Sequence, residues 1–455
     1  NIPPSSTMQF ALVSTTAGIN SAGSVGFTAQ SSLNTKFNFF CSNINGTGTA
    51  ALYNPSPNLF TAYFSCAYGN GTYNPYFCQQ SDSSIKVVDS TTVNINYYLY
   101  ETCVSPSVDL KEISGVGFRL FGNSSKDSLG YSVSGIGDIN ADGLADVIIG
   151  APGASPYGRT HAGSSYVLFG NPNLNDFNVS AVKPPQGFKI LGASGGDKSG
   201  GAVSAAITST TTPRLIVGAP SASPNRLQFA GSAYSVLFNP SNIVDLDLGA
   251  YNPNTVTVLN GIESNSYTGY SVSGVGRHTS KIVIGAPGYF IPGSKESNAG
   301  RAYLTSETLL PYLNVKDADT TSGNIANAGT AVSGIGDINK DGFDDIIVTA
   351  CTASPHGRRY SGESYVIFGR TGGFAEITMP LTDATWGFRI TGATRGDASG
   401  YAVGGAFDFN KDGYDDFIIG APSASYNNKE QAGAAYVIFG KQTGFTDIDL
   451  ATLRP

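Results

Sequence analysis

Alternating apolar and polar residues predict that this chain is built from short β-strands. The pattern is clearest from Gly130 to Pro152, where the runs GYSVSGIG and DVIIGAP lie on either side of an acidic loop. A period of two places every second side chain on one face of a sheet, and β-branched residues favour strands. The Gly-Ala-Pro corner marks the end of the second strand, because proline is tolerated where ladder hydrogen bonding has stopped.

This stretch is one copy of a repeat that fills the chain from about residue 109 onward. Each copy is followed by a strand that begins with a small residue, such as GSSYVLFG at 163 and GAAYVIFG at 433. A unit of about four strands cannot bury both faces alone, so we expect the units to stack as blades around an axis. The other copies are 200–220, 269–287, 333–349 and 404–422, and Gly-Phe strands precede three units at 117, 187 and 387.

The acidic loop in three copies predicts a calcium site. Oxygen-bearing side chains stand at loop positions one, three, five and nine, glycine at position six allows a sharp turn, and position seven offers a backbone carbonyl, as Ca²⁺ prefers. Position twelve is Ile149 rather than the Glu of an EF-hand, so the loop lies within a β-hairpin and would stiffen it. The predicted ligands are Asp138, Asn140, Asp142, Leu144 and Asp146; Asp337, Asn339, Asp341, Phe343 and Asp345; and Asp408, Asn410, Asp412, Tyr414 and Asp416.

The Gly-Ala-Pro corner, the acidic loop and the following Gly-x-x-Tyr strand recur in a fixed order. This order resembles the FG-GAP repeat, the blade of the integrin α-subunit β-propeller, over about three quarters of the chain. The resemblance implies an all-β propeller of four-stranded blades over 109–455, with calcium loops on the face opposite the partner-binding face. The family usually closes seven blades, whereas five are recognisable here. The family's Phe-Gly pair is also weakened, since the residue before the second glycine is Leu129, Gly200, Thr268, Ala328 or Ser399.

Residues 1–108 lack the repeat and are predicted to form a separate region. About seven short alternating runs, separated by turn sequences, indicate a small β-sandwich, although the same strands would also make two degenerate blades. Four cysteines cluster here without the spacing of a metal site, so we expect disulfide bonds in an oxidising, extracellular compartment; four reduced thiols are the alternative. These cysteines, which can pair in three ways, are Cys41, Cys66, Cys78 and Cys103.

Composition narrows the classes of function. Charged residues make up 13% of the chain and the net charge is −7, which argues against a nucleic-acid partner. The sequence contains no run of about 18 apolar residues, so we expect no membrane span. The chain starts at Asn1 rather than Met, so we expect a processed, secreted protein. Sequons permit glycosylation at Asn45, Asn70, Asn123 and Asn178.

The sequence shows none of the common catalytic motifs, so we do not expect an enzyme. It contains no HExxH helix or phosphate loop. His161 and His356 lie in equivalent loops beside Arg159 and Arg358, where they are either solvated loop residues or contacts for an anion or a partner. Cys351 stands where other units have proline, and we expect a buried, inert thiol rather than a reactive one.

Three functions fit these observations. The first is an extracellular, calcium-stabilised adhesion protein that binds a protein or glycan ligand at the cell surface. The second is a structural subunit of an extracellular filament or sheath, assembling head to tail by strand or edge exchange. It is suggested by the last residues, FTDIDLATLRP, which match the lead-in SVDLKEISGVGF to the first unit. The third is a carbohydrate-binding or carbohydrate-active protein, because aromatic rings stack on sugars.

Overall fold

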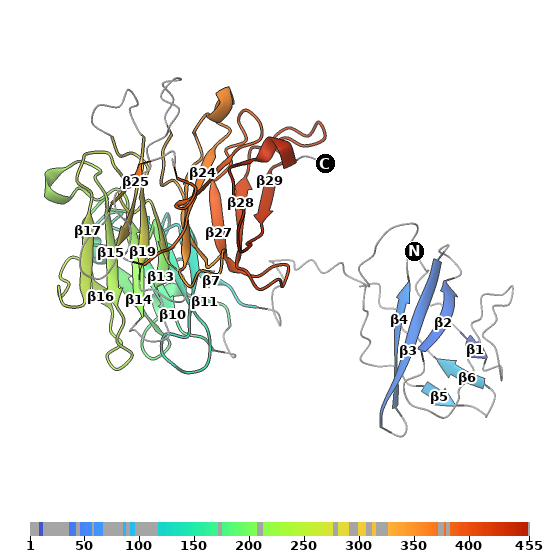
Figure 1. Ribbon diagram of the computed structural model, residues 1–455. Helices are drawn as coiled ribbons and strands as arrows, with labels where there is room; N and C mark the ends of the chain where they lie inside the picture. Colours follow the sequence, from blue (N-terminus) through green and yellow to red (C-terminus); the bar gives the residue numbers. More distant parts are fainter. Residues whose placement is uncertain are drawn as a thin grey trace. The chain divides into compact units, whose positions relative to one another are not determined.

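A computed structural model describes residues 117–453 and the backbone of six short strands between residues 9 and 95. The chain divides into two compact units, Asn1–Ile113 and Ser114–Pro455, each described by itself below (Figure 1). Only the backbone is described for 312–314 and 377–378. Outside the description lie 172–174, 207–212, 276–280, 291–298, 306–311, 315–325, 372–376 and 379–382.

The first unit contains two three-stranded antiparallel sheets among its described residues. One has the order β2 (Lys36–Cys41), β3 (Gly46–Ser56), β4 (Leu59–Cys66), and the other β1 (Gln9–Ala11), β6 (Thr92–Ile95), β5 (Ile85–Val87). The choice between a sandwich and two degenerate blades stays a prediction. The proposed disulfides and the sequons at Asn45 and Asn70 lie outside the side chains that the structure describes.

The second unit is a propeller-like array of five sheets that follow one another along the chain, as the repeat predicts. Blade I contains β8 (Ser132–Gly137), β9 (Asp146–Ala151), β10 (Ser164–Leu168) and β12 (Gly187–Leu191). Blade II contains β13 (Ala202–Ala206), β14 (Arg214–Ala219), β15 (Ser232–Leu237) and β17 (Val256–Asn260). Blade III contains β18 (Ser271–Gly274), β19 (Ile282–Ala286), β20 (Arg301–Thr305) and β21 (Tyr312–Asn314). Blade IV contains β22 (Val332–Gly336), β23 (Asp345–Ala350), β24 (Glu363–Ile367) and β26 (Gly387–Thr391), and blade V contains β27 (Ala402–Phe407), β28 (Asp416–Ala421) and β29 (Ala434–Ile438).

Two of the three Gly-Phe strands, β12 and β26, belong to the blade before them, which corrects the unit boundaries expected from the sequence. β12 pairs antiparallel with β10, so that Phe188 lies opposite Val167, and β26 pairs with β24, so that Phe388 lies opposite Val366. The Gly-Phe strand is therefore the outermost strand of its blade, and the chain then crosses to the inner strand of the next blade. Sequence repeats and structural blades are offset by one strand.

A two-residue strand from the following blade adds in parallel to the outer edge of several blades. β16 (Leu246–Asp247) pairs with β12, β25 (Ile377–Thr378) with β21, and β30 (Ile448–Asp449) with β26. The same arrangement joins β11 (Phe177–Asn178) to β7 (Leu120–Phe121), the first Gly-Phe strand. These additions tie neighbouring blades together at their rims.

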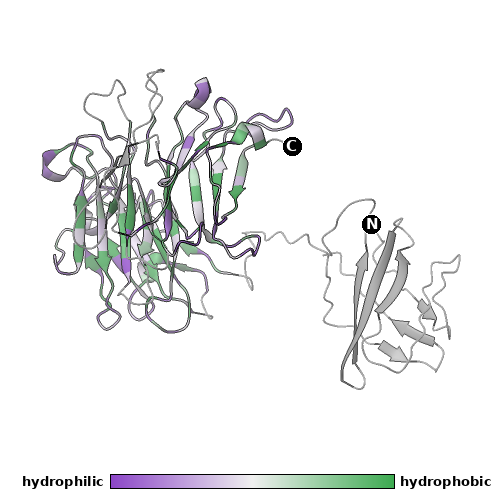
Figure 2. Ribbon diagram, in the orientation of Figure 1, coloured by the Kyte–Doolittle hydropathy of each residue, from purple (hydrophilic) through white to green (hydrophobic). Residues whose placement is uncertain are grey.

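The blades pack face to face around a common axis. The inner strands β8, β13, β18, β22 and β27 lie one against the next in that order. Apolar side chains fill the space between blades, as where Ile148 of blade I shares a buried cluster with Val217 of blade II. Figure 2 shows apolar residues concentrated in the strands and polar residues in the loops of this unit.

The helical elements of the described residues are short 3₁₀ turns, so the fold is all-β as predicted. They connect or end strands and do not cover the sheets as layers of helix would. The turns are η1 (Pro156–Gly158), η2 (Val179–Ala181), η3 (Pro224–Arg226), η4 (Pro355–Gly357) and η5 (Leu450–Leu453).

Candidate metal loops

The first acidic loop joins β8 to β9 and is shaped by hydrogen bonds from its own backbone. The Asp138 carboxylate accepts the N–H groups of Asp142 at 3.1 Å and Gly143 at 2.8 Å. Asn140 Oδ1 accepts the Asp142 N–H at 3.1 Å, and Asp142 Oδ1 accepts the Leu144 N–H at 2.9 Å. Gly143 has φ 88°, a conformation that glycine adopts without steric cost. The oxygens at positions one, three and five therefore gather around one tight turn.

The other two acidic loops repeat this geometry. Position one accepts the N–H groups of positions five and six at 3.1 and 2.9 Å in the loop from Asp337 and in the loop from Asp408. The glycines at position six have φ 89° and 88°. Three hairpins in three different blades thus fold the same residues into the same turn, as their common spacing predicts.

The aspartate at position nine has a second role that the spacing did not show. Asp146, Asp345 and Asp416 are buried at the start of the outgoing strand. Asp345 accepts the N–H of Ile338 at 2.9 Å and that of Gly369, beyond the third strand, at 2.7 Å. The equivalent pairs of bonds form at the other two aspartates. Position nine therefore anchors the loop to the third strand of its blade.

Burial affects the acidity of two of these anchors. Desolvation raises the pKa of Asp345 to about 8, against the opposing effect of its two backbone hydrogen bonds. Desolvation also raises the pKa of Asp146, and the nearby carboxylates of Asp142 and Asp138 add to the rise. A carboxylate in such a setting gains from a neighbouring positive charge.

The chemistry of the donor set fits a hard cation. Each loop offers a carboxylate at positions one, five and nine and an amide oxygen at position three, and Ca²⁺ selects oxygen ligands of this kind. Within the described part of the chain, no group of three or more His, Cys, Asp or Glu side chains is drawn together as a metal site. The loops thus have suitable ligands on a preformed turn, but their side chains would have to converge further on an ion.

The acidic loops coincide with the regions matched by a known repeat family. The FG-GAP repeat matches residues 129–168, 328–367 and 399–438, which are the three units with an acidic loop. The chain contains three FG-GAP repeats. The repeats lie in blades I, IV and V, and blades II and III, which stand between I and IV, keep the strands without the acidic residues.

Curated relatives of this FG-GAP protein include integrin α subunits. Integrin alpha-IIb of Homo sapiens is 30% identical over 176 residues, covering 37% of this chain and 16% of that protein. Integrin alpha-V of Gallus gallus is 29% identical over 167 residues, covering 35% and 15%. The phosphatidylinositol-glycan-specific phospholipase D of Bos taurus is 36% identical over 108 residues, covering 24% and 13%. The chain therefore spans less than a fifth of the length of each of these relatives.

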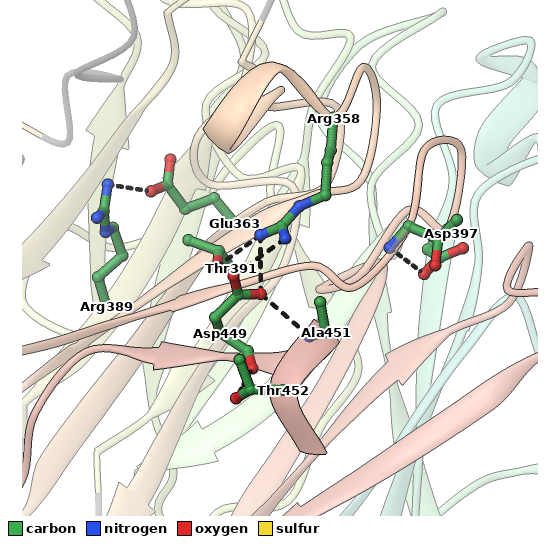
Figure 3. A network of polar contacts seen from close by, with 9 residues as sticks. Arg358, Glu363, Arg389, Thr391, Asp397, Asp449, Ala451 and Thr452 are labelled. Carbon is green, nitrogen blue, oxygen red and sulfur yellow. Dashed lines mark hydrogen bonds and ion pairs between the residues drawn. The ribbon is translucent and has the colours of Figure 1, made fainter. Parts of the chain in front are cut away.

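The arginines beside the two loop histidines of the FG-GAP protein have partners inside the array. Arg358 binds Asp449 through two hydrogen bonds of 2.8 and 3.0 Å and reaches Thr391 at 3.2 Å (Figure 3). Arg159 forms the equivalent ion pair with Asp247 at 2.8 Å. These pairs join a surface turn to the short parallel strand of the next blade, which favours a structural role for the turns over an anion site.

Two further residues singled out in the sequence can be placed. Cys351 is a free, buried thiol, and burial raises its pKa, as expected for an inert cysteine. The Asn178 amide nitrogen, to which a glycan would attach, donates to the Gly122 carbonyl at 2.7 Å, whereas Asn123 is exposed. The geometry therefore favours Asn123 over Asn178 as a glycosylation site. The helices among the described residues are too short and too polar to cross a membrane.

Sequence reasoning missed a set of aspartates that anchor the outermost strands of the FG-GAP protein. The Asp245 carboxylate accepts the backbone N–H of Lys189 at 2.9 Å, and Asp447 accepts that of Arg389 at 2.9 Å. Asp176 accepts the N–H of Arg119 in the same way. A repeated Asp-hydrophobic-Asp/Asn-hydrophobic sequence, at 176, 245 and 447, was the signal available for them.

Proposed function

We propose that this FG-GAP protein is an extracellular adhesion or interaction module whose three acidic loops bind Ca²⁺. The observation that carries the proposal is the identical turn geometry of the three loops. The similarity to integrin α subunits supports a role at the cell surface, where the ligand is a protein or a glycan. The proposal includes action by binding rather than by catalysis, because the sequence contains no HExxH helix or phosphate loop.

In each loop, the side chains at positions one, three, five and nine and the backbone carbonyl at position seven would hold the ion. Calcium supplies a double positive charge beside three carboxylates that otherwise repel one another. The protein holds positions one, three and five through the backbone N–H groups of the turn, and it holds position nine through the third strand. A bound ion would therefore stiffen the hairpin and, through position nine, the blade to which it belongs.

The test is calcium titration of chelator-treated full-length chain, followed by calorimetry and thermal melting. We expect three equivalents to bind, and each site to add about 2.7 kcal/mol of stability at 100 times its Kd. Asp408→Asn should remove one equivalent, whereas the matched variant Asp447→Asn, outside the loops, should bind all three. An unchanged melting temperature and no heat of binding would contradict the metal sites.

A second candidate ligand class is carbohydrate, for which three tyrosines give a specific reason. Tyr131, Tyr270 and Tyr401 precede the inner strands of blades I, III and V and are exposed. Partial desolvation raises the pKa of Tyr270, and the hydroxyl groups of Tyr131 and Tyr401 add to the rise. Exposed aromatic faces of this kind stack on sugar rings.

Binding of the full chain to glycan and matrix-protein arrays, with Ca²⁺ and with chelator, separates these ligands. Adhesion to protein targets that is lost with chelator supports the first proposal. Glycan binding that Tyr401→Ala abolishes, and that the loop variant Tyr426→Ala leaves unchanged, supports the second. The absence of binding to any array component, by chain shown to be folded and calcium-loaded, would count against both.

A further inference from the structure

The acidic loops of blades IV and V contact each other within the described array. Blade V follows blade IV directly, and their inner strands β22 and β27 lie side by side. Blades II and III stand between blade I and blade IV. The loops are called below the blade I loop (138–146), the blade IV loop (337–345) and the blade V loop (408–416). Three similar donor sets therefore have different surroundings.

The first contact comes from Asp415, at position eight of the blade V loop. Its Oδ2 atom accepts the backbone N–H of Asp337, the first predicted ligand of the blade IV loop, at 3.0 Å. A methyl group added to Gly336 would collide with the same oxygen, so the carboxylate lies directly against this backbone. Asp415 thus holds the residue that supplies position one of the neighbouring loop.

The blade I loop has different surroundings among the described residues. The blade that follows it is blade II, where Pro213 precedes β14 as Asp415 precedes β28. Proline has no carboxylate that could accept an N–H group. Asp138, at position one of the blade I loop, is exposed, whereas Asp337 is half-buried. The first ligand of the blade IV loop is therefore the one that a neighbouring blade covers.

A lysine makes a second contact between the two loops. The Lys340 ammonium, at position four of the blade IV loop, lies 4.8 Å from the centre of the Tyr414 ring, and a cation is attracted to an aromatic face. A methyl group added to Gly413 would lie 2.8 Å from the same Nζ atom. At the equivalent Gly143 and Gly342 it would meet no described atom within 4 Å. Because Tyr414 offers the position-seven carbonyl, this contact reaches a predicted ligand residue.

Backbone hydrogen bonds connect the two position-nine aspartates. Asp416 accepts the N–H of Gly440 at 2.9 Å, and the N–H of the next residue, Lys441, donates to the Ile338 carbonyl at 2.9 Å. The N–H of Ile338 in turn donates to Asp345 at 2.9 Å. A short run of backbone therefore leads from the buried aspartate of one loop to that of the other.

We propose that the acidic loops of blades IV and V bind Ca²⁺ as a coupled pair, with Asp415 as a positioning residue, whereas the blade I loop binds independently. This inference rests on the calcium sites of the proposed function. When the blade V loop binds Ca²⁺, the backbone around Asp415 and Asp416 becomes fixed, and with it Asp337 and Ile338 of the blade IV loop. The second ion then has less chain to order, which gives positive cooperativity. Solvent screens the repulsion between ions bound at exposed loops.

Calcium titration of full-length chains that each lack one loop tests the coupling. Asp138→Asn leaves the loops of blades IV and V, Asp337→Asn leaves those of blades I and V, and Asp408→Asn leaves those of blades I and IV. Calorimetry should show positive cooperativity in the first variant, in which each ion binds about fivefold or more tightly when the other is present. The other two variants should each bind two equivalents independently.

Changes at Asp415, made in the Asp138→Asn chain, test its positioning role. Asp415→Ala removes the acceptor of the Asp337 N–H and leaves the predicted ligands of both loops in place. We expect the two remaining ions to bind independently in this variant. Asp415→Asn keeps an acceptor oxygen at the same distance from the backbone and should restore the cooperativity. A general loss of stability would not produce this difference between the two variants.

Two lysines at position four of their loops provide a matched pair in the same chain. Lys340→Ala removes the cation from the Tyr414 ring and should lower the cooperativity. Lys411→Ala, at an exposed position of the blade V loop, should leave the cooperativity unchanged. Each change removes one positive charge beside one acidic loop, so the two differ in the contact between loops. If Asp415→Ala fails to fold, as judged by its melting in chelator, this pair decides the question.

The outcomes distinguish the coupling from calcium binding itself. Two independent sites in the Asp138→Asn chain would overturn the coupling and leave the calcium sites in place. Equal cooperativity in all three variants would show that the coupling does not pass through this contact, which also overturns it. Cooperativity that survives Asp415→Ala would overturn the role of Asp415. No heat of binding in the unmodified chain would contradict the proposed calcium sites and this inference together.

Discussion

Blade IV lies inside the array and blade I lies at its end, and the same repeat residue has different surroundings in the two. Val332, on the inner strand of blade IV, is 6% exposed, whereas its counterpart Val133 in blade I is 69% exposed. One strand further out, Ile346 is fully buried and Val147 is 38% exposed. The side chains are alike, so the difference comes from the blade that, among the described residues, packs on one and not on the other.

The comparison shows that a single blade supplies only one side of a core and needs a neighbouring blade to bury its apolar face. An internal blade buries both faces between its neighbours, while blade I, at the end of the described array, has an exposed apolar face of the same composition. Exposed contiguous apolar surface of this kind marks an interaction site on a folded protein. Stability should therefore vary along the array by position and not by residue type.

The largest expected contrast is between Phe368→Ala and Phe439→Ala. Phe368 packs against Phe388 and Phe445, and its removal should cost about 3–5 kcal/mol of unfolding free energy. Phe439 is half exposed, so its removal should cost less than about 1 kcal/mol in dilute protein. Urea denaturation of both variants measures the difference. Equal losses would break the comparison, because Phe439 would then be packed as deeply as Phe368.

A smaller contrast is expected at the glycines. Gly285→Ala places a methyl group 2.0 Å from the Gly329 carbonyl oxygen and should cost roughly 1–3 kcal/mol, because backbone must move. Gly420→Ala has room for the methyl group and should be neutral or stabilise by up to about 1 kcal/mol, since alanine restricts the unfolded chain. Melting temperatures at micromolar concentration provide the measurement. A destabilising Gly420→Ala would indicate that blade V is already covered.

The smallest expected effect concerns the ion pair between Arg358 and Asp449 (Figure 3). Desolvation raises the pKa of Asp449, but hydrogen bonding to Arg358 outweighs it and holds the pKa below its ordinary value. A lowered folded pKa adds stability that is present above about pH 4 and is lost as the pH falls through the folded value. Asp449→Asn should therefore cost about 1 kcal/mol near neutral pH and less in acid. A loss that does not shrink in acid would rule out the charge as its cause.

Much of the fold could be predicted because its signals are local. The alternation in residues 130–152 and the Gly-Ala-Pro corner correctly indicated hairpins, and the recurrence of the pattern indicated five blades. The assignment of the Gly-Phe strands could not be made in this way. Phe188 precedes the inner strand of blade II in sequence, yet it pairs with Val167 of blade I, because pairing is decided between strands and not along the chain.

The candidate sites could also be predicted only in their local features. The spacing of Asp337, Asn339 and Asp341 predicted a tight oxygen-rich turn, and the structure contains it. The spacing did not show that Asp345 is held by the Gly369 N–H, which lies 24 residues away beyond the next strand. Nor could the motif around Arg358 reveal its partner Asp449, since the two meet only when the short strand of the next blade adds to the rim.

The sequence by itself determined the strands, the acidic turns and the number of recognisable repeats, because each depends on a few neighbouring residues and their backbone preferences. Only the tertiary structure decided to which blade each outermost strand belongs and which apolar faces of the described blades are covered. Those outcomes depend on the stacking of whole sheets. A blade buries its second face only against another blade. The sequence of a single repeat does not indicate whether that neighbouring blade is present.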